Sequence, residues 1–76
     1  MNRDIESLSA KGKASEGIAV VRKYVEYFES AKGMRPQNIV VAPAHYDAML
    51  KTANSQAPEG TTFTSLSFRG IPLVRQ

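Results

Sequence analysis

The chain has 76 residues, a formal net charge of +3 and no cysteine, so it can form at most one small domain without disulfides. Its single histidine cannot build a structural zinc site, and no apolar run approaches the roughly 20 residues of a membrane span. We therefore expect no metal, no cofactor and no membrane partner. A domain of this size buries only about 60% of its unfolded surface, so its stability rests on compact packing, self-association or docking on a larger partner.

Residues 1–14 are polar and small, and Ile5 and Leu8 alone offer a helix little to bury. Lys11-Gly12-Lys13 is typical of a flexible joint. The segment is predicted to be a flexible or weakly helical arm, followed by a single small domain over residues 15–76.

Residues 15–32 carry the pattern of an amphipathic helix. Ser15 can cap its first turn, and Gly33 suits the position that follows its last turn. Burial of the apolar stripe is expected to dominate its stability, because the charge pairs on its flank contribute only about 0.2–0.5 kcal/mol each. The stripe recurs every three or four residues and consists of Ile18, Val21, Val25 and Phe28, widened by Tyr24 and Ala31.

A strand and a second helix are predicted next. Ile39-Val40-Val41 is a short β-branched run, which favours a strand covered on both faces. Pro43 suits the first turn of a helix that ends at Asn54 or Ser55. Its inward positions are expected to be Tyr46, Met49, Leu50 and Ala53.

The carboxy-terminal residues predict a β-hairpin around a two-residue turn at Arg69-Gly70. In that register Phe68 faces Ile71, and Leu66 faces Leu73. Pro72 keeps the last strand from taking a full partner on its outer side, so this strand is expected at the sheet edge. The predicted fold is α+β in two layers, with the order helix-strand-helix-strand-strand and both helices on one face of a small sheet.

No residue set predicts a reaction. His45, Tyr46 and Asp47 are neighbours on a helix, so their side chains point about 100° apart and cannot converge on one atom. The glycines do not group into a phosphate-binding loop, and there is no cysteine nucleophile. We therefore do not expect an enzyme.

Candidate interaction residues lie on three predicted surfaces. The exposed flank of the first helix carries Arg22, Lys23 and Tyr27, and tyrosine is favoured in interface cores. The hairpin and its edge supply Arg69, Ile71 and Arg75 for docking or strand addition. Phe63 is either an exposed ring that could grip a base or a partner, or a side chain covered by the second helix or the arm.

A family pattern is visible in four short phrases of the sequence. They are Gly33-Met34-Arg35-Pro36, Ile39-Val40-Val41-Ala42-Pro43, Tyr46 with Leu50, and Gly70-Ile71-Pro72-Leu73-Val74. With these phrases, residues 16–76 resemble part of the major capsid proteins of HK97-type tailed phages. The resemblance implies a peripheral-domain-like αβ unit with its spine helix at Ser15–Lys32. Members of that family are much longer, so we expect a capsid-like module or a head-associated protein rather than a complete shell subunit.

The function predicted from these observations is that of a non-catalytic phage structural or interaction protein, located in the virion or the host cytoplasm. Its partners would be other copies, capsid subunits or a host protein. The alternative is a small basic phage regulator that inhibits a host protein or binds nucleic acid. The salt dependence of binding distinguishes a protein partner from a nucleic acid. For each phosphate contact, the logarithm of the binding constant falls by about 0.9 when the logarithm of the salt concentration rises by one unit.

Overall fold

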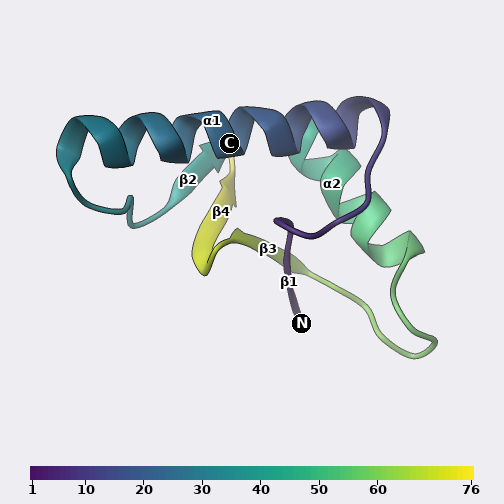
Figure 1. The fold of residues 1–76 in the computed structure, drawn as a ribbon. Coiled ribbons are helices and arrows are strands. Elements are labelled where there is room, and N and C mark those ends of the chain that lie inside the picture. The colour runs from purple at the N-terminus through teal and green to yellow at the C-terminus, as the bar shows by residue number, and fades with distance from the viewer.

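In the computed structural model, which describes residues 1–76, two helices lie against one face of a four-stranded mixed sheet (Figure 1). The predicted α+β fold is thereby confirmed. Leu66, Phe68, Ile71 and Leu73, the four apolar side chains of the predicted hairpin, are all buried in the core between sheet and helices. The elements in chain order are β1 (Asn2–Asp4), α1 (Gly12–Lys32), β2 (Ile39–Val41), α2 (Pro43–Ser55), β3 (Ser65–Phe68) and β4 (Ile71–Arg75).

The hairpin has the predicted register. Strands β3 and β4 are antiparallel, and Phe68 faces Ile71 while Ser67 faces Pro72. The two turn residues, Arg69 and Gly70, have φ values of 50° and 80°. Two left-handed residues match the twist of the flanking strands, which explains why this turn suits a two-residue hairpin.

The predicted position of β4 at the sheet edge is wrong. The strand order is β1-β3-β4-β2, so β4 is an inner strand and β2 is an edge. Pro72 does not prevent this arrangement, because the parallel pairing with β2 begins one residue later, where Leu73 faces Ile39. The expectation that β2 is covered on both faces is also wrong, since Val40 remains 61% exposed on the open face of the sheet.

The predicted arm over residues 1–14 is corrected as well. Residues 2–4 form β1, which pairs in parallel with β3, and the Ile5 N–H donates to the Ser67 carbonyl at 2.8 Å. Ile5 is fully buried in the core, and Leu8 is nearly so. The sequence signal is weak because Asn2-Arg3-Asp4 has the composition of a loop, and its partner strand lies more than 60 residues away.

Helix α1 begins at Gly12, with Lys11 rather than Ser15 as its N-cap residue, so it is longer than predicted. It ends as predicted at Lys32, where Gly33 adopts a left-handed conformation and its N–H donates to the Glu29 carbonyl. Helix α2 has the predicted bounds and buries Tyr46, Met49 and Ala53. Neither helix has the length and apolar character needed to cross a membrane.

Candidate interaction surface

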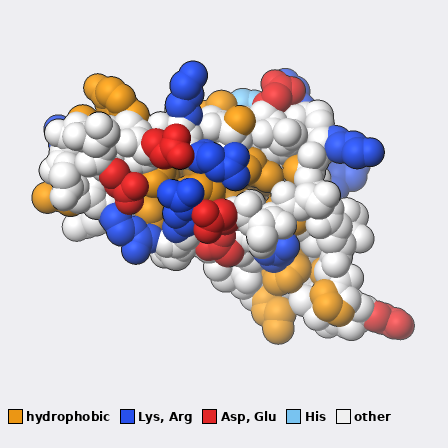
Figure 2. All heavy atoms as spheres, in the orientation of Figure 1, with side chains coloured by type: hydrophobic (Ala, Val, Ile, Leu, Met, Phe, Trp, Pro, Cys, Tyr) orange, Lys and Arg blue, Asp and Glu red, His pale blue; other side chains and the backbone are white.

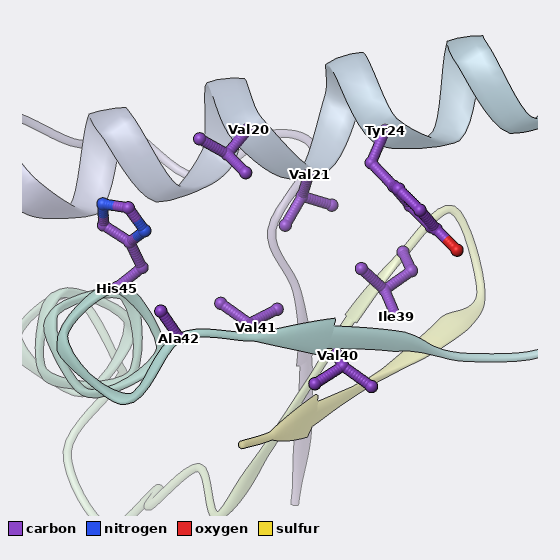
Figure 3. A pocket seen from close by; sticks show the side chains of 8 residues that line it. All are labelled: Val20, Val21, Tyr24, Ile39, Val40, Val41, Ala42 and His45. Atoms are coloured by element: carbon purple, nitrogen blue, oxygen red, sulfur yellow. The ribbon is translucent and has the colours of Figure 1, made fainter.

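An apolar groove lies between α1 and the edge strand β2. It has a volume of about 280 Å³ and is partly enclosed between the helix and the strand (Figure 3). None of its lining residues carries a formal charge at neutral pH with histidine neutral. We call it the α1/β2 groove; its lining residues are Val20, Val21, Tyr24, Ile39, Val40, Val41, Ala42 and His45.

Exposed apolar side chains border this groove on both sides. Val20 and Tyr24, four residues apart on α1, are 55% and 43% exposed. In Figure 3 the Ile39 and Val41 side chains point from β2 toward α1, whereas Val40 points to the opposite face of the sheet. Val74, which faces Val40 on the neighbouring strand, is also exposed. Apolar surface thus continues from the α1 flank across the edge to the open face.

The edge itself has free main-chain groups. The Gln76 N–H donates to the Val41 carbonyl at 2.9 Å, so this carbonyl points toward β4. Backbone groups of successive strand residues point in alternate directions, so the N–H and C=O of Val40 face away from β4. An edge of this kind is a template for another strand, and no lysine or proline within Ile39–Val41 blocks it.

Arg22 and Arg69 meet on another face, which is charged. Their guanidinium carbons lie 5.9 Å and 4.9 Å from the ring centroid of the buried Phe68. Arg69 also forms an ion pair with Glu6 at 2.6 Å. In the view of Figure 2, acidic and basic side chains are intermixed on the surface. The hydrogen bond with Glu6, supported by the nearby carboxylates of Glu26 and Glu29, raises the pKa of Arg69 above its ordinary value.

Arg75 lies away from that cluster and pairs with α2. Its guanidinium donates to both carboxylate oxygens of Asp47, at 2.9 and 3.0 Å. This hydrogen bonding raises the pKa of Arg75 and lowers the pKa of Asp47. Lys23 and Tyr27 remain exposed on α1, the tyrosine at 73%. The predicted interaction residues therefore do not form one continuous site.

The structure corrects one predicted interaction residue and decides between the two arrangements considered for another. Ile71 is only 3% exposed, because β4 lies inside the sheet and its side chain faces the helices. Phe63 is partly buried and packs against the core, which is the second of the two arrangements considered for it. Asn54 holds this segment on α2, since its side chain donates to the Phe63 carbonyl and accepts from the Phe63 N–H.

The groove residues Val20 and Val40 are absent from the sequence-based candidates. A partial signal for the helix side exists, because Val20 lies four residues before Tyr24 at the border of the apolar stripe. No comparable signal exists for Val40, since a β-branched run has the same composition in an inner and an edge strand. No cluster of three or more His, Asp or Glu residues has the arrangement of a metal site.

No protein-family model, curated protein or solved structure matches the chain significantly.

Proposed function

We propose that this protein is a non-catalytic interaction module that acts through protein–protein contacts, in the setting of a phage head or virion. The observation that carries the proposal is the apolar surface at the α1/β2 groove. Three apolar side chains that are 43–61% exposed, Val20, Tyr24 and Val40, border a groove without charged lining next to a free strand edge. Such a surface favours protein association, because burying it removes apolar area from water and pairs exposed backbone groups.

The phage setting rests on the sequence resemblance, and the local structure is compatible with it. Gly33 ends α1, Pro36 is buried in the connector, and Pro43 opens α2, so the residues of the resemblance occupy structurally demanding positions. A helix over Ser15–Lys32, which the resemblance implies, lies within the longer α1 over Gly12–Lys32, and this supports the proposal.

Nucleic-acid binding is a weaker alternative on electrostatic grounds. Arg69 and Arg75, two of the candidate basic residues, each bond to a carboxylate. Phosphate binding would have to compete with these carboxylates. On the face of the molecule that Figure 2 shows, basic and acidic side chains are intermixed, whereas nucleic-acid sites usually collect basic side chains in one patch.

A site-specific crosslinking experiment tests the proposal. A photoreactive amino acid replaces Val40 at the groove edge, and the same substitution at the exposed Lys51 on α2 serves as the control. The tagged chains are irradiated in phage-infected host cells, and the crosslinked proteins are identified by mass spectrometry. We expect phage head proteins, or other copies of the chain, to be crosslinked from Val40 and far less from Lys51.

Two results would contradict this function. Crosslinks to a host enzyme alone, with inhibition of that enzyme by the purified chain, would favour the regulator. Micromolar binding of a labelled DNA or RNA that falls steeply with added salt would favour a nucleic-acid role.

A further inference from the structure

We propose that the α1/β2 groove accepts a second copy of this chain, with β2 pairing antiparallel to the partner's β2 around a two-fold axis at Val40. This inference rests on the proposed function and names the partner for one surface. The two four-stranded sheets would join into one continuous sheet, with the two α1 helices side by side on the same face.

The free edge is self-complementary. Val40 offers one outward N–H and one outward C=O, and an antiparallel partner centred on its own Val40 would satisfy both groups at once. The two-fold arrangement therefore needs no donor or acceptor that the chain does not itself supply. Pairing of this kind places the same patch of both copies in contact, as in most homodimers.

The helix above the edge fits the same symmetry. Helix α1 runs over β2 in the opposite direction. Along the direction of the strand, Val40 lies between Val20 and Tyr24 (Figures 1 and 3). A two-fold axis through Val40 consequently makes the two α1 helices antiparallel and brings Tyr24 of one copy next to Val20 of the other. Each tyrosine ring would then enter the mouth of the neighbouring groove.

The exposed apolar area suits a weak, reversible dimer. Val20, Tyr24 and Tyr27 lie on one flank of α1 and Val40 lies at the strand edge, and all four are more than 40% exposed. With about 150–250 Å² for a whole aromatic side chain and less for valine, the exposed parts of these residues offer on the order of 400 Å² per copy. Two copies would bury up to about 800 Å², which is in the range of weak and transient interfaces.

Charge also favours this edge over the other one. Each copy carries a net charge of +3, yet the groove lining contains no lysine or arginine, so like charges do not meet at the centre of the interface. The opposite edge, β1, carries Arg3 and Asp4, whose side chains are already engaged with neighbouring groups. A two-fold β2 pair is therefore favoured over head-to-tail joining of β1 to β2.

Analytical ultracentrifugation of the purified full chain, from micromolar to millimolar concentration, tests the inference. We expect a reversible monomer–dimer equilibrium. Val20→Glu and Tyr24→Lys each place a charge in the interface, and each should weaken dimerisation about tenfold or more. An equimolar mixture of the two variants should recover dimer, because the introduced carboxylate of one copy would meet the introduced ammonium group of the other. The control Ala19→Glu adds the same charge at an exposed neighbouring position and should leave the equilibrium unchanged.

Circular dichroism tests whether each variant is folded, which we expect because neither Val20 nor Tyr24 is buried in the core. A chain that stays monomeric throughout overturns the inference, as does a dimer that neither charge weakens, or assembly beyond the dimer. These results leave the proposed function standing if Val40 still crosslinks to phage head proteins. Conversely, the two charged variants could weaken the dimer singly and recover it when mixed, while no phage protein is crosslinked from Val40. That result would support the β2 pairing and contradict a role in the phage head or virion.

Discussion

Asp4 connects the amino-terminal strand to the hairpin, and its removal tests whether residues 1–14 belong to the folded domain. One carboxylate oxygen accepts the Glu6 N–H at 3.0 Å. The other accepts the Gly70 N–H at 3.1 Å and the Ser67 hydroxyl at 3.3 Å. These bonds join the end of β1 to β3 and to the β3–β4 turn.

We expect Asp4→Asn to lower the free energy of unfolding by about 1–2 kcal/mol at pH 7. A buried hydrogen bond to a charged group contributes about 1.5–3 kcal/mol, and the partial exposure of this carboxylate reduces its share. The melting temperature should fall by about 4–8 °C for each kcal/mol in a domain of this size. Urea denaturation followed by circular dichroism measures the difference.

The pH dependence of the same pair of proteins gives a second measurement. Partial burial acts to raise the pKa of Asp4, but hydrogen bonds from the backbone of Glu6, Gly70 and Arg69 and from Ser67 outweigh it, so the pKa lies below its ordinary value of 3.8. The unfolded chain therefore binds the proton more readily than the folded chain. The stabilisation is fully present above pH 3.8 and is lost as the pH falls through the folded-state pKa.

The stability difference between wild type and Asp4→Asn should consequently shrink as the pH falls below 3.8. Asp47→Asn serves as the control. Hydrogen bonding to Arg75 also lowers the pKa of Asp47, but this pair involves no residue of the amino-terminal strand. An Asp4→Asn variant as stable as wild type at pH 7, or a difference independent of pH, would refute this account of the amino-terminal strand.

Two further predictions concern the core. Ile5→Ala removes a fully buried side chain and should destabilise the fold by about 2–5 kcal/mol in urea denaturation, whereas a mobile arm would give no change. Gly17→Ala places a Cβ 3.0 Å from the His45 Cβ and 3.1 Å from the Met49 side chain. Steric strain of about 1–3 kcal/mol should exceed the helix-propensity gain of about 1 kcal/mol, so thermal melting should shift downward. The control Ser30→Ala, at an exposed position of α1, should not lower the melting temperature. If Gly17→Ala also left the melting temperature unchanged, α1 and α2 would be able to move apart at no cost.

Local patterns were sufficient for most individual elements. The apolar period predicted both helices, Gly33 and Pro43 marked a helix end and a helix start, and Arg69-Gly70 predicted the hairpin register. These features depend on residues close together in the chain, whose side-chain and backbone preferences act over one or two turns. Strand β1 escaped prediction because its three polar residues have no such preference and are held by partners across the sheet.

The amino-acid sequence by itself determined the two helices, the hairpin and the core side chains that these elements supply, because each follows from periodicity or from a turn conformation. The core positions of Ile5 and Leu8 did not follow from it. Only the tertiary structure decided the strand order, which places β4 inside the sheet and leaves β2 at its edge. The physical reason is that strand pairing joins backbone groups, which are the same in every residue except proline, so composition does not specify which neighbour a strand takes. The α1/β2 groove depends on that choice, since Val40 is available to a partner only because no strand lies beyond it.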